Sequence, residues 1–229
     1  MLTVRRIVLS LAAFAALAFA SLAGASSIKE VGVDNAEKFQ KPGCPQNCEA
    51  IGQVTGYQTQ VGKAKNPYVI GRKGKIVAWT IALSQPNSRQ MRFFSDLYGP
   101  TPKARIAVIK LTDHKRKGKL IAESGTYNLK PYLGSTPTFG LNKPLPVPKN
   151  SVVALTVPTW APAFTVKLSS KYAWRASRSS SACGDVEQQA AQQRVSSTRA
   201  YGCSYRTARM LYSASFVPDP KPTTPAKSK

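Results

Sequence analysis

Short runs of apolar residues, interrupted by polar positions at strand-like spacing, recur along the middle of the chain. The clearest lie at 75–83 and 151–157, where β-branched and aromatic residues stand between glycine, proline or polar turn residues. Residues 104–111 and 119–123 flank a short polar turn and predict a hairpin. Weaker strands are predicted at 53–60, 127–129, 138–141, 172–177 and 208–217.

About eight short strands without alternating helices predict an all-β fold, a single antiparallel β-sandwich that is jelly-roll-like. An immunoglobulin-like sandwich is the second expectation. Long loops and one short helix complete the prediction. The helix is expected to begin after Asn87, its N-cap, and to carry Met91, Phe94 and Leu97 on its inner face. Trp79 lies among aliphatic residues and is expected in the core.

The first residues have the composition of an export signal. Arg5 and Arg6 precede an apolar stretch that is too short to span a bilayer. The small residues Ala23 and Ala25 follow at the positions that signal peptidase needs. Residues 1–25 are therefore predicted to be a cleaved signal peptide, and the general secretory route is favoured over the twin-arginine route. We expect a secreted or cell-surface protein with no transmembrane segment after signal removal.

The rest of the chain divides by composition into three parts. A polar, turn-rich segment predicts an irregular N-terminal arm, the apolar runs predict the sandwich, and a proline-rich basic end predicts a disordered tail. Their limits are 26–50, 51–217 and 218–229. Within the sandwich, residues 179–199 are rich in serine, glutamine and alanine and predict an excursion outside the core.

Four cysteines in a chain expected to leave the cytoplasm favour two disulfides. The pairs Cys44–Cys48 and Cys183–Cys203 are preferred, because the first closes a short turn and the second a loop of about 20 residues. Crossed pairs that tie the arm to the C-terminal region are the alternative. A zinc site is disfavoured by the wide spacing of the second pair. We expect no metal and no cofactor.

Basic residues greatly outnumber acidic ones. The chain has 33 Lys and Arg against 10 Asp and Glu, a formal net charge of +23. Such a charge attracts polyanions, although its spread along the chain is equally explained by solubility. Nucleic acid is expected to bind only non-specifically. The densest basic run is predicted to be the solvated turn of the hairpin and contains Lys115, Arg116, Lys117 and Lys119.

Catalytic chemistry has little support. The single histidine, His114, lies among cations, and the sequence contains no nucleophile elbow, zinc-protease motif, phosphate loop or dinucleotide fingerprint. The few acidic residues are scattered, and only Glu123 lies on a predicted strand of the sandwich. We assign no catalytic residue.

Candidate binding residues come from two segments. Trp160 and Phe164 lie among Pro158 and Pro162, which place them at a sheet edge or in a loop. They would form either an exposed platform for a sugar ring or a plug at the end of the sandwich. Arg175 and Arg178 could share a small cationic surface that matches carboxylate or phosphate groups, although surface salt bridges are the commoner use of such residues.

Several segments together resemble a group of exported bacterial proteins of actinobacterial type. They are Lys-Ile-Val-Ala-Trp at 75–79, Ala-Arg-Ile-Ala-Val at 104–108, the stretch 153–164, Trp-Arg-Ala-Ser-Arg at 174–178 and Cys-Ser-Tyr at 203–205. The resemblance covers most of residues 50–217 and implies one exported domain. It implies no activity, cofactor or catalytic residue.

The leading hypothesis is an exported, non-enzymatic module that binds carbohydrate or polyanionic material of a cell envelope. Cations would attract the ligand and exposed aromatic rings would stack on it. A structural or protein-interaction role in the envelope is the alternative, and a glycan hydrolase is less favoured.

Overall fold

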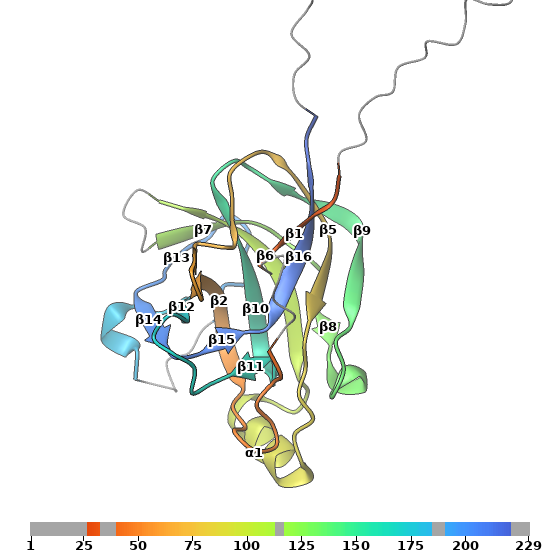
Figure 1. The fold of residues 1–229 in the computed structure, drawn as a ribbon, viewed down its shortest axis with the longest axis vertical. Coiled ribbons are helices and arrows are strands. Elements are labelled where there is room, and N and C mark those ends of the chain that lie inside the picture. Colours follow the sequence, from red (N-terminus) through yellow and green to blue (C-terminus); the bar gives the residue numbers. More distant parts are fainter. Residues whose placement is uncertain (1–26, 33–39, 113–116, 185–190, 221–229) are drawn as a thin grey trace, which may run out of the picture.

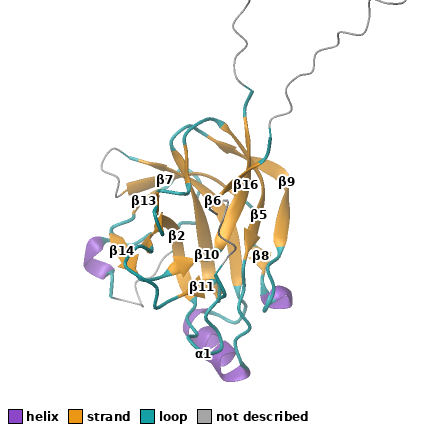
Figure 2. Cartoon of the chain, in the orientation of Figure 1, coloured by secondary structure: helices purple, strands orange, loops and turns teal. Residues whose placement is uncertain are grey.

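The computed structural model describes residues 27–32, 40–112, 117–184 and 191–220. Within these residues the protein is built from antiparallel strands, with helical turns only at its periphery (Figure 2). This confirms the expected all-β sandwich. The predicted export signal, the turn residues Lys115 and Arg116 and most of the predicted tail lie outside the described residues.

Two sheets form most of the molecule (Figure 1). The smaller sheet has four strands, in the order β1 (Lys29–Val31), β16 (Tyr212–Pro218), β5 (Gly74–Ile81) and β9 (Thr138–Val147). The larger sheet has ten strands. Its main path runs β13 (Thr198–Ala200), β7 (Lys117–Glu123), β6 (Lys103–Leu111), β10 (Ser151–Ala161), β2 (Ile51–Val61), β12 (Ala173–Ala176) and β14 (Cys203–Arg206).

Short strands and helical turns complete the structure. β3 (Ala64–Lys65), β4 (Val69–Ile70) and β8 (Tyr127–Asn128) pair with β2, β10 and β6, while β11 (Phe164–Thr165) pairs with β15 (Arg209–Met210). The helical elements are α1 (Ser88–Tyr98), η1 (Lys130–Tyr132) and η2 (Ser180–Ala182).

The core lies between the two main sheets. Trp79 of β5 is fully buried, as expected, and its ring packs against Phe139 and Tyr127 at 5.0 and 5.7 Å between centroids. Tyr68 stacks on Tyr212 at 4.4 Å. These large rings fill the space between strands whose inward positions are otherwise valine, isoleucine, leucine and alanine.

The predicted helix is confirmed as α1, but the predicted inward position of Leu97 is not. The Asn87 side chain accepts a hydrogen bond from the Gln90 amide at 3.0 Å, and the Gln90 side chain accepts one from the Asn87 amide at 2.9 Å. Phe94 is buried as expected. Leu97 is exposed, so its predicted inward position is wrong, because α1 lies at the end of the sandwich and buries only a narrow stripe.

The proline-rich stretch lies where β10 leaves the centre of the larger sheet. β10 pairs with both β6 and β2 as far as Thr156, whereas Val157, Trp160 and Ala161 pair with β2 alone. This one-sided pairing agrees with the edge position expected from the prolines. Trp160 is paired with Gly52, and the register shifts between Val157 and Trp160. Since Pro158 has no amide hydrogen to donate, it fits this irregular part of the strand, which pairs on one side only.

Two segments expected to be irregular take part in the fold. In the arm, β1 pairs with β16 and extends the smaller sheet. Of the predicted excursion at 179–199, the described part includes β13, which pairs with β7, and the fully buried Gln192. The excursion was expected to avoid the core, and that prediction is wrong at Gln192. The disulfides Cys44–Cys48 and Cys183–Cys203 are present, as preferred from the spacing.

Candidate functional site

Trp160 and Phe164 are packed inside the protein. Trp160 is only 1% exposed, its indole Nε1 donates a hydrogen bond to the Gly99 carbonyl at 3.0 Å, and its ring lies 5.3 Å from that of Phe94. Phe164 is buried edge-on against Trp174 at 5.6 Å. The exposed sugar platform is therefore wrong, and the alternative of a plug at the end of the sandwich describes these residues.

Arg175 and Arg178 face two different cavities rather than one shared surface. Arg175 of β12 lies opposite Tyr57 and Ser204 in the neighbouring strands, and its Nη1 donates to the Tyr201 carbonyl at 2.9 Å. Arg178 follows the end of the strand and is 7% exposed. Its Nη1 donates to the hydroxyl of Tyr205 at 3.1 Å and to the carbonyl of Cys183 at 3.2 Å.

The cavity beside Arg175 is a groove of about 970 Å³, which we call the basic groove. Segments far apart in the sequence line it, because β2, β3, β4, β6, β12 and β14 all reach it. The lining residues are Tyr57, Thr59, Gln60, Lys65, Asn66, Val69, Lys110, Leu111, Thr112, Asn150, Ala173, Arg175, Ser204 and Arg206. This set contains four cations and no carboxylate.

The four cations of the basic groove keep their charge available. Within the described residues, none of Lys65, Lys110, Arg175 and Arg206 forms an ion pair, since the salt bridge found there joins Arg105 to Glu123 at 2.8 Å. Lys110 donates to the Lys149 carbonyl at 2.6 Å, which holds its ammonium group at the groove. Hydroxyl and amide side chains between the cations can donate further hydrogen bonds to an anion.

Tyr57 forms part of the groove lining and stays neutral. Burial raises the pKa of Tyr57 to about 12, and the nearby Arg175 opposes this shift only in part. The phenol is therefore protonated at neutral pH. It adds no negative charge to the groove.

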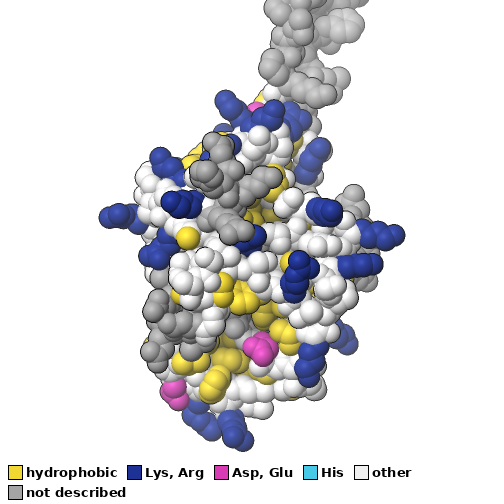
Figure 3. All heavy atoms as spheres, turned by 90° about the vertical axis from the view of Figure 1, so that its left-hand side faces the viewer, with side chains coloured by type: hydrophobic (Ala, Val, Ile, Leu, Met, Phe, Trp, Pro, Cys, Tyr) yellow, Lys and Arg dark blue, Asp and Glu magenta, His cyan; other side chains and the backbone are white. Residues whose placement is uncertain are grey.

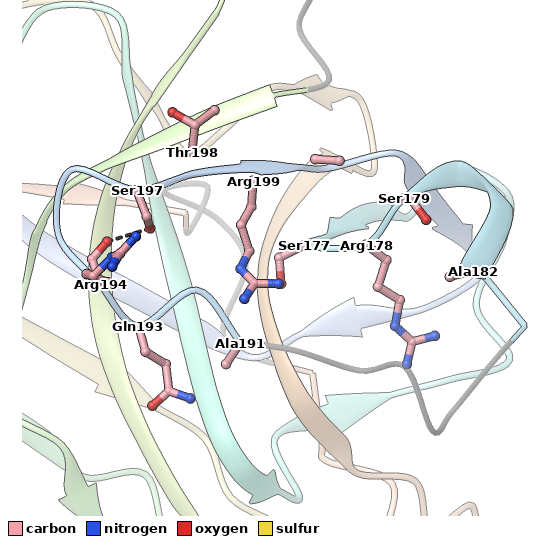
Figure 4. A pocket seen from close by; sticks show the side chains of 11 residues that line it. Ser177, Arg178, Ser179, Ala182, Ala191, Gln193, Arg194, Ser197, Thr198 and Arg199 are labelled. Carbon is pink, nitrogen blue, oxygen red and sulfur yellow. Dashed lines mark hydrogen bonds between the residues drawn. The ribbon is translucent and has the colours of Figure 1, made fainter.

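The cavity beside Arg178 has a volume of about 680 Å³, and we call it the arginine pocket (Figure 4). Arg178, Arg194 and Arg199 line it together with the hydroxyl groups of Ser177, Ser179, Ser197 and Thr198. Arg199 extends across the opening toward Ser177, whereas Arg178 lies at the other end beside η2 (Figure 4). The Nε atom of Arg178 is buried and has no hydrogen-bond partner in the described part of the chain.

A buried polar network fixes the segment around Gln192, which lies beside the arginine pocket. Gln192 accepts a hydrogen bond from the Tyr201 hydroxyl at 2.7 Å and donates to the carbonyls of Ser197 at 2.7 Å and Gly118 at 3.1 Å. The backbone N–H of Gln192 also donates a hydrogen bond to the Thr55 hydroxyl at 2.9 Å. Sequence reasoning missed this residue, because one glutamine in a glutamine-rich run gives no signal of burial.

The basic turn is only partly as predicted. Lys117 and Lys119 belong to β7 and lie opposite Ala200 and Thr198 of β13. Lys119 begins the strand that was predicted at 119–123, whereas the placement of Lys117 in the turn is wrong. The hairpin starts its second strand earlier than its apolar pattern suggested, because exposed lysines also fit the solvent side of a strand. Lysine and arginine side chains are spread over this face of the molecule, with few acidic side chains among them (Figure 3).

The described residues contain no group of three or more His, Cys, Asp or Glu side chains placed to hold a metal ion. Glu123 is paired with Arg105, and its pKa is raised by burial, an effect that the guanidinium opposes. Among the same residues, no helix is long and apolar enough to cross a membrane.

Comparison of the chain with protein-family models, curated proteins and solved structures finds no significant match. The resemblance to exported proteins of actinobacterial type therefore stays a prediction. The charge and lining of the two cavities are the features from which a function can be argued.

Proposed function

We propose that the protein is an exported binding module for polyanionic material of the cell envelope, and that the basic groove holds a linear anionic polymer. The observation behind the proposal is the groove lining, in which four cations from separate strands meet without a carboxylate. Phosphate-bearing wall polymers and acidic polysaccharides have the repeated charge that such a groove attracts. The two disulfides suit an oxidising compartment outside the cytoplasm.

The geometry supports charge recognition better than stacking on neutral sugars. Trp160 is buried and cannot offer its ring to a ligand. Arg175 and Arg206 instead present planar guanidinium groups, which can form two parallel hydrogen bonds to one phosphate or carboxylate. A carbohydrate ligand would then be held through its acidic groups.

The test compares groove cations with equally exposed cations elsewhere. Lys65→Ser combined with Arg206→Ser removes two charges from the groove, and Lys103→Ser combined with Lys143→Ser removes two exposed charges outside it. Binding of inorganic polyphosphate is measured by calorimetry at one fixed salt concentration. We expect the groove variant to bind about tenfold more weakly, or worse, and the control to change by no more than about twofold, as each removed contact is worth about 1 kcal/mol or more.

Equal losses in the two variants would contradict the proposal. They would show that net charge, rather than the groove, attracts the polymer. Both variants change exposed side chains, so similar thermal unfolding is expected for all three proteins.

A further inference from the structure

Helix α1 presents apolar side chains to solvent at the end of the sandwich opposite β1 and the end of β16 (Figure 1). Phe93 is 61% exposed and Leu97 is 45% exposed. The two residues are four positions apart and therefore lie on one side of the helix. Phe94, between them in sequence, points inward and packs against Trp160.

A cleft of about 290 Å³ adjoins this helix and contains further apolar groups. Its apolar lining residues are Met91, Pro100, Pro102, Leu133 and Trp160. The cleft lies along the side of α1 that carries Met91, Arg92 and Asp96, and Phe93 and Leu97 are not among its lining residues. The α1 end therefore presents two separate apolar areas. An exposed apolar surface bordered by polar groups marks a place where a soluble domain meets another surface.

Cations lie beside the apolar residues at this end. Arg89 is exposed one turn before Phe93. Arg92 of α1 and Lys130 of η1 both line the cleft. Asp96 is the one carboxylate among the cleft-lining residues and α1. None of these four charged groups forms an ion pair within the described residues, so the cations are available to an external anion.

The helix is held rigidly in this position. Its first turn is capped by Asn87, and the Gln90 side chain donates to the Pro45 carbonyl, beside the Cys44–Cys48 disulfide, at 2.8 Å. The contact of Phe94 with Trp160 fixes its middle. Phe93 and Leu97 are therefore presented without any rearrangement of the fold, which lowers the cost of binding through them.

We propose that the α1 end docks reversibly on the surface of an anionic lipid bilayer. Phe93 and Leu97 would enter the boundary between head groups and acyl chains, and Arg89, Arg92 and Lys130 would contact lipid phosphates. Apolar side chains with adjacent cations match the two components of such binding, apolar burial and attraction to anionic lipids. A protein partner would not require the cations, whereas an anionic bilayer uses both kinds of residue.

The test uses sedimentation with vesicles of phosphatidylcholine, with and without phosphatidylglycerol. Phe93→Ser combined with Leu97→Ser removes the apolar contact. Ile28→Ser combined with Val195→Ser is the matched control, because both of these residues are also exposed and lie outside α1. Sedimentation is measured at one fixed salt concentration, and the Lys65→Ser, Arg206→Ser variant measures any contribution of the basic groove to lipid binding.

We expect the α1 variant to bind vesicles containing phosphatidylglycerol about tenfold more weakly than the unaltered protein, and the control to change by less than about twofold. Arg89→Glu combined with Arg92→Glu should also weaken binding to these vesicles. Unaltered vesicle binding by the α1 variant would overturn the proposal. The proposal would also be overturned if the unaltered protein bound no vesicles but self-associated, and the α1 variant did not. The face would then be an interface with a second copy.

This inference is independent of the polymer-binding proposal. The α1 variant should bind inorganic polyphosphate as the unaltered protein does, because Phe93 and Leu97 do not line the basic groove. Failure of vesicle binding with normal polyphosphate binding would reject the α1 proposal alone.

Discussion

The basic groove and the α1 end both display cations, but among different neighbours. In the groove, Lys110 and Arg206 stand mostly among hydroxyl and amide groups, with Val69 and Leu111 also in the lining. At the α1 end, Arg92 and Lys130 border Met91 and other apolar side chains. The same type of charge thus serves two kinds of contact. Binding at the groove should depend strongly on salt, and binding at the α1 end should depend on it less, because apolar burial contributes there.

The two regions also differ in whether separate residues stabilise the fold and contact the proposed ligand. At the α1 end, the inner face depends on Trp160, while the outer face presents Phe93. In the groove, Arg175 has both roles, because it lines the cavity and also donates a hydrogen bond to the Tyr201 carbonyl within the fold. Substitutions can therefore separate folding from binding more cleanly at the α1 end than at Arg175.

The largest effect on stability is expected from Trp160→Ala. The substitution leaves a cavity between β10 and α1 and should lower the free energy of unfolding by about 3–5 kcal/mol. Phe93→Ala on the neighbouring outward position should change it by less than about 0.5 kcal/mol. Urea denaturation measures both values. Similar values for the two variants would contradict the division of α1 into a structural and an exposed side.

The disulfide near the arginine pocket should contribute more than the one in the arm. Cys183–Cys203 closes a loop of 20 residues, whereas Cys44–Cys48 spans only 4. Stabilisation by a disulfide increases with the length of the loop that it closes. Replacing Cys183 and Cys203 by serine should therefore lower the free energy of unfolding by about 3 kcal/mol, and replacing Cys44 and Cys48 should lower it by less. Thermal unfolding of the two double variants gives their order, and the reverse order would contradict this account.

Gln192 is expected to stabilise the segment beside the arginine pocket. Gln192→Ala would leave the buried Tyr201 hydroxyl without its acceptor and should cost about 1–3 kcal/mol. Gln193→Ala is the control, because Gln193 is exposed on the same segment and should have almost no effect. Urea denaturation of the two variants tests this, and equal costs would show that the network around Gln192 does not hold the segment.

Alkaline pH should lower the stability of the protein partly through Tyr57, which lines the basic groove. Its pKa is raised from 10.0 to about 12 in the folded protein, so the unfolded chain loses this proton first as the pH rises. The contribution of Tyr57 to stability is present below pH 10.0 and is lost as the pH rises toward about 12. Tyr57→Phe should therefore make stability fall less steeply across this range, as measured by denaturation at several pH values. An unchanged pH dependence would contradict the assigned cause.

Local patterns predicted much of the architecture. The strand at 75–83 and the Asn87 cap depend on neighbouring residues, which the sequence displays directly. The two disulfides followed from spacing and loop closure. These features need no knowledge of how distant strands pair.

The features that were missed depend on long-range pairing. Trp160 and Phe164 are buried because Phe94, Gly99 and Trp174 from other parts of the chain contact them. Lys65, Lys110 and Arg206 meet only because β3, β6 and β14 reach one cavity. Gln192 became buried because the sheet and β13 surround it with acceptors and donors, which no local periodicity records.

The central claim is that the basic groove, rather than overall charge, holds an anionic polymer. Its most direct test is the slope of log affinity against log salt concentration for polyphosphate, compared between the unaltered protein and the variant Lys65→Ser, Arg206→Ser. Because each lost phosphate contact lowers the slope, the account predicts a decrease in magnitude of about two for this variant and almost none for Lys103→Ser, Lys143→Ser. Equal slopes for the unaltered protein and the groove variant would contradict it.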